Sequence, residues 1–420
     1  MGQTVLPVQA VFDTTTDAFV GLYLAGDSSP VDVGAPTSAA LAKGAVGNIA
    51  VSSLGTAYRP DGRHHLTVKS KELLSKKFQL RGTQARVGLL RCNILVVGDS
   101  TSAGVPARAN SYPTYLAQVL TSMGRPATAS SWFGLGGQTT MAAWQTYDPR
   151  ISYGAGWTVQ SNKTVGGQFP CNNGVDLTAL SFTPTDAFDT IEIIYYRQAG
   201  NATFTVDIGG SVLTGGTINS AGATALQRAT VSTGAAAALS TVNIKRNGTG
   251  TNLLILAVMC YDSAKPMFNV WNGGWFGSVV ADWSDSSVAL SPINAINFLA
   301  PNLTIINLGI NDWIAGTNLD TYLTNLQAVI NAAAAQGDVI LCSGFASSTA
   351  LATEAIQLTF VDAIRNLAWT NNIPYMSYRD QFGTWADASA AGWTADARHP
   401  NSPGHARAAC VLADFLTAAV

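Results

Sequence analysis

The chain has 420 residues, of which 47% are hydrophobic and only 11% are charged. This length predicts two or three structural units, because a single hydrophobic core seldom grows that large. The formal net charge of −2 gives no support to the class of proteins that bind nucleic acid through overall positive charge.

Residues 1–91 are expected to form a small β-rich N-terminal region that ends in a basic connector. Short extended runs such as "TVLPVQAVFD" and "AFVGLYLAG" are separated by Gly, Pro and Asp, a pattern typical of strands and turns. Residues 59–91 hold nine of the 23 Lys and Arg residues. We interpret this segment as a solvated linker face, with a docking surface for an acidic partner as the alternative.

Neither a secretion signal nor a membrane span is predicted. Residues 1–10 lack a basic stretch followed by an apolar run, so no signal peptide is expected. No stretch of 18 apolar residues occurs, so no insertion into a membrane is expected. The localisation stays unknown on these grounds, and the expectation is a virion component or a protein that acts at the cell surface.

Strands and helices begin to alternate at Cys92. The run "NILVVG" predicts a buried strand, and "YPTYLAQVLTSMG" predicts a helix with Pro113 near its start and Gly124 after its end. The alternation resumes over 265–420, where the strands "NLTIINLG", "DVILCSG" and "IPYMSY" are separated by helices and "SPGHARAACVLADFLTAA" forms the last helix. Continuous apolar strands that alternate with helices predict a parallel sheet covered on both faces.

Residues 151–264 show a different pattern. Short strands such as "DTIEIIYYR", "ATFTVDIGG" and "NLLILAVMCYD" follow one another with Gly, Asn and Ser turns between them. This spacing predicts a β-sandwich or jelly roll that divides the α/β domain into a first part, 92–150, and a second part, 265–420. Such an insertion is tolerated at a surface loop because its two ends lie close together.

The five cysteines indicate neither a metal site nor a disulfide framework, since they are widely spaced and form no CxxC pair. Cys92, Cys342 and Cys410 lie in apolar segments and are expected to be small buried residues. Whether Cys171 and Cys260 pair stays open. No Gly-rich phosphate loop is convincing either, so we expect neither a metal nor a cofactor.

A candidate serine nucleophile, Ser100, directly follows the first strand of the α/β pattern. Such a serine needs a base, which is usually histidine, and the chain has only four. His64 and His65 lie in the connector, and His405 lies inside the last helix, where a packing or capping role is expected. His399 precedes that helix, and Asp396, three residues upstream, is near enough to orient its ring. The alternative is that Ser100 lies in an ordinary strand-to-helix turn and that Asp396 and His399 lie in an ordinary surface turn.

Asn311 follows another strand of the same sheet, in "INLGINDW", and is expected at the same edge as Ser100 and His399. An asparagine amide can donate a hydrogen bond to a developing oxyanion. The alternative is an Asx turn that ends the strand. Asp312 is expected to hold its own loop.

Three blocks together resemble the SGNH (GDSL-type) hydrolases: Gly98-Asp99-Ser100, Gly309-Ile310-Asn311-Asp312 and Asp396-Ala397-Arg398-His399. The run "HPNSPGHARAA" is also similar to the way this family enters its final helix. The resemblance covers 92–125 and 265–420 and implies a three-layer αβα, flavodoxin-like domain. It implies Ser100 as nucleophile, His399 as general base and acid, and Asp396 as the residue that orients His399. The Ser100 N–H and Asn311 would form the oxyanion hole.

The same resemblance implies a further oxyanion glycine, for which the sequence offers two candidates. Gly277 lies in an Asn-x-Gly-x-x-Gly-Ser pattern, and Gly137 follows the strand after the first helix. The chain between Gly277 and Gly309 has room for one helix and one strand, whereas the stretch from Gly137 includes the whole insert. This spacing favours Gly277 and leaves Gly137 open.

The resemblance implies an ester substrate, and two features favour an acetylated carbohydrate. The predicted sandwich resembles carbohydrate-binding modules found in some polysaccharide and peptidoglycan O-acetylesterases. Five aromatic residues near the predicted site look exposed and could stack on sugar rings, with Trp275 and Trp313 as the chosen substrate-binding residues; the others are Trp271, Phe276 and Trp283. Core packing is the alternative for each.

The expected function is therefore a serine esterase that removes O-acetyl groups from a surface polysaccharide. A general carboxylesterase or lipase is the alternative within the family, and a non-catalytic glycan-binding or structural tail protein is the alternative outside it. The stretch "VFDTTTDAFVGLYLAGDSSPVDVGAP" loosely resembles the particle-proximal part of bacteriophage tail proteins. A virion component or a homo-oligomer thus stays open.

Overall fold

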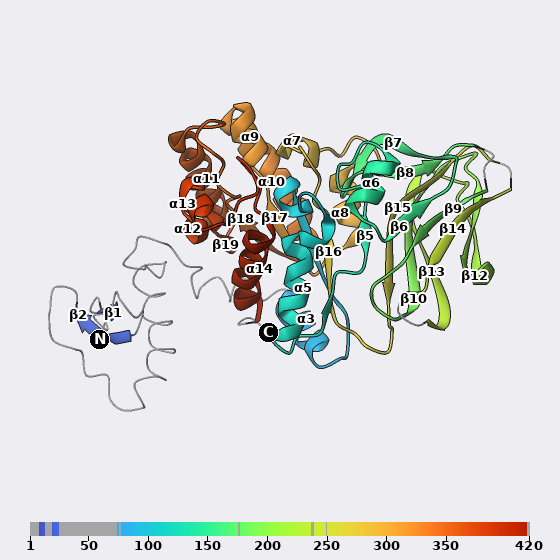
Figure 1. The fold of residues 1–420 in the computed structure, drawn as a ribbon, viewed down its shortest axis with the longest axis horizontal. Helices are drawn as coiled ribbons and strands as arrows, with labels where there is room; N and C mark the ends of the chain where they lie inside the picture. Colours follow the sequence, from blue (N-terminus) through green and yellow to red (C-terminus); the bar gives the residue numbers. More distant parts are fainter. Residues whose placement is uncertain are drawn as a thin grey trace.

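The computed structural model describes residues 8–12, 19–24, 74, 77–174, 177–236, 239–248 and 250–417 (Figure 1). Near the N-terminus, β1 (Val8–Phe12) and β2 (Phe19–Leu24) form an antiparallel pair. The rest of the predicted N-terminal region and most of the basic connector, including His64 and His65, lie outside the described residues. Within the described part of the chain, no helix is long and apolar enough to cross a membrane.

The main sheet has six strands in the order β19-β18-β17-β3-β16-β4, and each neighbouring pair is parallel. Its strands are β3 (Cys92–Gly98), β4 (Ala127–Thr128), β16 (Phe268–Asn272), β17 (Leu303–Asn307), β18 (Asp338–Cys342) and β19 (Tyr375–Met376). Apart from the edge strand β4, the order is that of a flavodoxin-like sheet. Every residue of β16, β17 and β18 is buried, which accounts for their apolar runs.

Helices cover both faces of this sheet. Successive side chains of a strand point to opposite faces, so Ile94 and Val96 of β3 pack in one core and Leu95 and Val97 in another. The first core holds α3 (Phe78–Arg86), α5 (Tyr112–Ser122) and α14 (Ser402–Thr417). The second holds α8 (Pro292–Leu299), α10 (Leu319–Gln336) and α11 (Glu354–Thr370). The expected three-layer α/β domain is confirmed.

The inserted segment folds into two antiparallel sheets that lie beside the main sheet (Figure 1). The rings of Tyr195 and Phe204 connect the sheets at a centroid distance of 5.3 Å. One sheet contains β13 (Ala225–Ala236), β10 (Phe188–Arg197), β15 (Leu253–Tyr261), β8 (Gly167–Asn172) and β7 (Trp157–Thr164). The other contains β12 (Ser211–Asn219), β11 (Thr203–Ile208), β14 (Val242–Asn247), β9 (Ala179–Phe182) and β6 (Ile151–Tyr153).

Two segments differ from their expected place. β5 (Trp132–Phe133) precedes residue 151, yet it pairs with β15 of the insert. Helix α3 lies in the expected connector, yet Phe78 is fully buried in the core of the α/β domain. The structured part of the α/β domain therefore begins before Cys92.

The cysteines are all free thiols, so Cys171 and Cys260 do not pair. Cys92 and Cys342 are buried, as expected for small residues in apolar strands. The prediction for Cys410 is wrong because this residue is exposed. The buried face of α14 is formed by residues such as Ala408, Ala409 and Leu412, which leaves Cys410 on the solvent side.

Candidate active site

Ser100 lies at a sharp turn between β3 and the short helix α4 (Ser100–Ala103). Asp99 caps this helix, since its Oδ1 accepts hydrogen bonds from the Thr101 N–H at 2.8 Å and the Thr101 hydroxyl at 2.7 Å. The turn needs glycine at position 98, because a Cβ there would lie 2.1 Å from Ser102 Oγ and 2.9 Å from the Asn307 carbonyl oxygen. The turn thereby places Ser100 at the carboxyl edge of the sheet.

His399 and Asp396 lie in line with Ser100. His399 Nε2 is 2.9 Å from Ser100 Oγ, and His399 Nδ1 is 2.7 Å from Asp396 Oδ2. Asp396 Oδ1 also accepts the backbone N–H groups of Arg398 at 2.8 Å and His399 at 2.9 Å. The structure thus brings the three predicted residues together in one hydrogen-bonded row.

The electrostatics of this row suit proton transfer from Ser100. Partial burial acts to raise the pKa of the Asp396 carboxyl, but hydrogen bonds from the His399 ring and the N–H groups of Arg398 and His399 lower it below its usual value. The carboxylate therefore stays ionised and accepts the Nδ1–H of His399. Nε2 is then the nitrogen that can accept the Ser100 proton.

Gly277 lies in a loop and Asn311 in a short helix, both at the sheet edge where Ser100 lies. They follow β16 and β17, the two strands that flank β3. The Asn311 Nδ2 donates a hydrogen bond to the Ser278 carbonyl oxygen at 2.9 Å, which ties helix α9 (Ile310–Ala315) to the Gly277 loop. Gly277 has a φ of +73°, and a Cβ there would meet no atom within 4 Å. Within the described residues, the backbone N–H groups of Ser100 and Gly277 have no hydrogen-bond acceptor.

Gly137 occupies a different position. It follows β5, which pairs with a strand of the insert and not with β3. A Cβ at Gly137 would lie 2.5 Å from the Phe276 nitrogen and 2.7 Å from Trp275 Cδ1. The Phe276 N–H donates to the Gly136 carbonyl oxygen at 3.0 Å. Gly137 thus belongs to a loop that packs against the Gly277 loop, and this placement favours Gly277 as the further oxyanion donor.

The side chain of Asp312 fixes the Gly277 loop from the other side, whereas the sequence-based expectation is that it holds its own loop. Its side chain is fully buried, and its two carboxylate oxygens accept the Val280 N–H, at 3.1 and 3.3 Å, at the start of α7 (Val280–Trp283). Burial raises the pKa of the Asp312 carboxyl to about 7; the Val280 N–H lowers it, and the charges of Asp99 and Asp282 raise it further. Asp312 is therefore partly protonated near neutral pH.

The prediction that Trp275 and Trp313 contact substrate is wrong, because both side chains belong to the core. Trp275 is 6% exposed and packs against Trp283, and Lys163 of the insert lies 4.6 Å from its ring. Trp313 is 2% exposed; its Nε1–H donates to Ser347 Oγ at 3.1 Å and its ring contacts Phe360. Trp271 and Trp283 are buried as well.

Three further residues support the site; Asn272 is the first residue of the pattern that contains Gly277, whereas Trp385 and Asn307 were not singled out from the sequence. Trp385, half-buried in α13 (Trp385–Ala390), donates its Nε1–H to the Asp396 carbonyl oxygen at 3.0 Å. The Asn307 amide donates to Thr101 Oγ1 at 3.1 Å and Ser102 Oγ at 2.9 Å. The Asn272 amide donates to the Ala103 carbonyl oxygen at 3.1 Å. Both asparagines are the last residues of buried strands, a position from which the sequence predicts a role at the sheet edge. No sequence pattern predicts the role of Trp385.

Of the two histidines that the structure describes, His405 takes no part in the row. It is fully buried near the rings of Tyr112 and Phe345, a packing role as predicted. Burial, with a smaller effect of the charge on His399, lowers the pKa of His405 to about 3, so the ring is neutral. In the described part of the chain, no three His, Cys, Asp or Glu side chains are grouped to hold a metal ion.

Comparison with known proteins finds one matching family model and several similar solved structures. Residues 270–407 match the model of the GDSL-like Lipase/Acylhydrolase family. That range includes Gly277, Asn311, Asp396 and His399, whereas Ser100 precedes the insert. No curated protein matches the chain.

Among solved structures, the chain is similar to one described as "Peptidoglycan O-acetylesterase in action, 5 min". The two share 17% identity and a TM-score of 0.60, over 82% of this chain and 96% of that chain. A weaker match is a carbohydrate esterase family 3 protein from Talaromyces cellulolyticus, with 19% identity and a TM-score of 0.29 over 38% of this chain and 74% of that chain. Another is the lipase/acylhydrolase from Enterococcus faecalis, with 18% identity and a TM-score of 0.31 over 35% of this chain and 75% of that chain. The first likeness shows a shared fold over most of both chains.

Proposed function

We propose that this chain, whose residues 270–407 match the model of the GDSL-like Lipase/Acylhydrolase family, is a serine esterase that removes O-acetyl groups from a carbohydrate, with Ser100 as the nucleophile. The observation that carries the proposal is the row of hydrogen bonds from Ser100 through His399 to Asp396. A serine hydroxyl is a weak nucleophile unless a positioned base takes its proton, and this row supplies the base and its orienting carboxylate.

In the first half of the reaction, Ser100 Oγ attacks the ester carbonyl carbon while its proton passes to His399 Nε2. The resulting tetrahedral oxyanion is stabilised by the Ser100 N–H, with Gly277 N–H and the Asn311 amide as the other proposed donors. His399 then gives its proton to the leaving sugar oxygen as the ester C–O bond breaks. An acyl-serine remains.

In the second half, a water molecule attacks the acyl-serine and transfers a proton to the same nitrogen. The new tetrahedral species collapses, His399 returns the proton to Ser100 Oγ, and the acid leaves. Asp396 stays ionised throughout and stabilises the imidazolium that forms twice in each cycle.

The acetylated carbohydrate is the finer part of the proposal. It is supported by the fold shared with the structure described as a peptidoglycan O-acetylesterase, over 82% of this chain and 96% of that chain. Carbohydrate binding by the insert itself stays a prediction. Its described aromatic side chains are buried or half-buried, so they present no exposed stacking surface.

The test compares three substrates at equal enzyme concentration: O-acetylated peptidoglycan, an aryl acetate and a long-chain aryl ester. We expect acetate release from the glycan and the aryl acetate, and slow turnover of the long-chain ester. The Ser100→Ala variant should lose nearly all hydrolysis of both acetyl esters. Preferred hydrolysis of the long-chain ester would favour the lipase alternative, and no hydrolysis of any ester would favour a non-catalytic protein.

A role as a virion tail component is not part of this proposal. The stretch that suggested it lies largely outside the described residues, and no comparison supports it.

A further inference from the structure

A cavity lies at the opposite end of β3 from Ser100. It has a volume of about 670 Å³, within the usual range for small-molecule sites. Asn93 at the start of β3 is part of its wall, whereas Ser100 follows the end of this seven-residue strand. A strand of that length spans about 20 Å. The cavity is therefore separate from the proposed esterase site.

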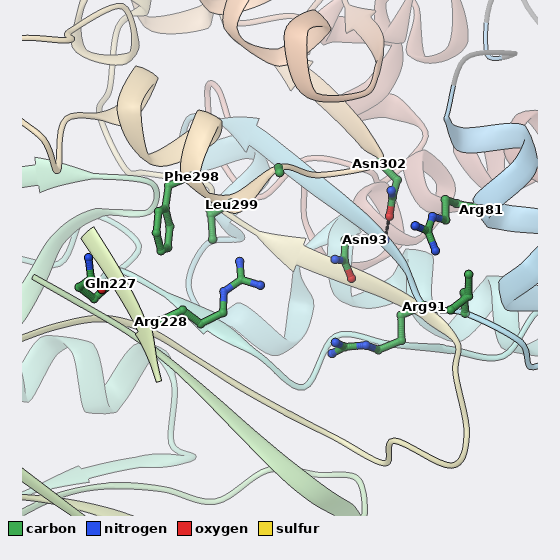
Figure 2. A pocket seen from close by; sticks show the side chains of 10 residues that line it. Arg81, Arg91, Asn93, Gln227, Arg228, Phe298, Leu299 and Asn302 are labelled. Carbon is green, nitrogen blue, oxygen red and sulfur yellow. Dashed lines mark hydrogen bonds between the residues drawn. The ribbon is translucent and has the colours of Figure 1, made fainter. Parts of the chain in front are cut away.

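Three arginines line this cavity, and they come from different parts of the chain (Figure 2). Arg81 lies on α3, Arg91 directly precedes β3, and Arg228 lies on β13. Figure 2 shows all three side chains around Asn93. Guanidinium groups that converge on one cavity favour an anionic ligand, since each can bind a carboxylate or a phosphate through two N–H groups.

The nearby carboxylates do not balance these charges. Glu192 pairs with two of the arginines, at 3.2 Å from Arg91 and 3.4 Å from Arg228, and also accepts the Tyr261 hydroxyl at 2.6 Å. Arg81 has no carboxylate within 4 Å among the described residues. Asp338, near the start of α3, is buried and accepts the Lys77 and Phe78 N–H groups. The cavity keeps an excess of positive charge.

The uncharged polar groups of the wall also offer donors. Asn302 Oδ1 accepts the Asn93 N–H at 2.8 Å, and Asn93 Oδ1 accepts the Asn269 amide at 2.9 Å. Both side-chain oxygens are therefore occupied, and neither amide NH2 group has an acceptor among the described residues. Such groups suit the oxygen atoms of hydroxyls and of an anionic group.

One side of the cavity is apolar. Phe298 and Leu299, from the end of α8, line it, and the Arg228 guanidinium lies 5.7 Å from the Phe298 ring. The cavity thus combines a cationic cluster, free amide donors and an aromatic wall, and it is far larger than a bare anion needs. We propose that it binds an anionic sugar, one that carries a carboxylate or a phosphate group. This proposal does not depend on the esterase function.

Calorimetric titration of the full chain at low salt tests whether the cavity binds an anionic sugar. The four probes are glucuronic acid, glucose 6-phosphate, glucose and inorganic phosphate. We expect at least one anionic sugar to bind about tenfold more tightly than glucose and phosphate, and added NaCl to weaken this binding. The Arg81→Gln and Arg228→Gln variants should each weaken it about tenfold or more, because each loses a charge-assisted contact. Aryl acetate hydrolysis should stay unchanged in both.

The matched control is Arg86→Gln, an exposed arginine on the same helix that does not line the cavity. It should leave sugar binding unchanged. Three results would each overturn the proposal: no binding of either anionic sugar, binding that the cavity variants leave unchanged, or inorganic phosphate binding as tightly as the sugars.

Discussion

His399 Nε2 lies 2.9 Å from Ser100 Oγ, although 299 residues separate the two in the chain. Their meeting follows from the packing of two helices. Ser100 precedes α5, His399 precedes α14, and the buried faces of these helices share one core beneath the sheet. His405 of α14 stacks on Tyr112 of α5, at a ring distance of 6.5 Å. The contact between the helices therefore holds the base against the nucleophile.

Replacing the nucleophile should abolish turnover without unfolding the protein. For Ser100→Ala we expect kcat on an aryl acetate to fall about 10⁴-fold or more, because the covalent route is lost while oxyanion stabilisation remains. Circular dichroism and thermal melting should match the unaltered protein. Ser122→Ala, at an exposed serine of α5, is the control and should keep full activity. Comparable turnover by both variants would refute the assignment.

Asn311→Ala removes one proposed oxyanion donor. We expect kcat to fall about 10²- to 10³-fold with a smaller change in KM, since the interaction strengthens only in the transition state. Asn297→Ala, at an exposed asparagine of α8, serves as the matched control. Steady-state kinetics check both variants, and an Asn311 variant with unchanged kcat would show that this amide only holds the Ser278 carbonyl.

Gly277→Ala and Gly137→Ala separate the two candidate glycines. A Cβ at Gly277 meets open space, so the positive φ alone should cost about 1 kcal/mol of stability. A Cβ at Gly137 would overlap the Phe276 nitrogen, so we expect a larger fall in Tm. Per folded molecule, kcat should fall more for Gly277→Ala. A larger fall in Tm for Gly277→Ala, together with a larger fall in kcat for Gly137→Ala, would assign the oxyanion role to Gly137.

Asp312 predicts a pH dependence of stability. Its pKa of about 7 in the folded protein exceeds the unfolded value of about 4, so between these values the folded state binds more protons. The Asp312 contribution to the free energy of unfolding therefore decreases as pH rises through this range and stays low above pH 7. The Asp312→Asn side chain stays neutral at every pH, so it makes no pH-dependent contribution to the free energy of unfolding.

Denaturant unfolding of both proteins from pH 5 to pH 8 checks this prediction. The stability of Asp312→Asn relative to the unaltered protein should rise by about 3 kcal/mol over the range, at about 1.4 kcal/mol per pKa unit. Asp99, whose pKa burial raises to about 6, titrates in both proteins and largely cancels. Two stability curves that run parallel would mean that Asp312 is ionised in the folded state.

Much of the α/β domain could be predicted because its strands are buried on both faces. That burial gives continuous apolar runs such as "NILVVG", and the polar residues that end them gather at one sheet edge. Ser100, Asn311 and His399 could be proposed for that reason. The scarcity of histidines also helped, since it left one credible base.

The remaining features depend on contacts that a single sequence does not encode locally. From the sequence, Trp275 is expected to be exposed because its segment lies near the predicted site, yet Gly137 and Gly167, distant in the chain, lie against its ring. Helix α3 escaped prediction because only Phe78, Gly82 and Ala85 of its nine residues are buried, which gives little apolar periodicity. The arginine cavity unites α3, β13 and α8, which no local pattern connects.

The central claim is that Ser100 is an activated nucleophile, and labelling with a fluorophosphonate followed by peptide mass mapping tests it most directly. We predict one covalent adduct, on Ser100, that forms more slowly by orders of magnitude in His399→Ala and not at all in Ser100→Ala. An adduct on another residue, or no adduct on the folded protein, would contradict the account.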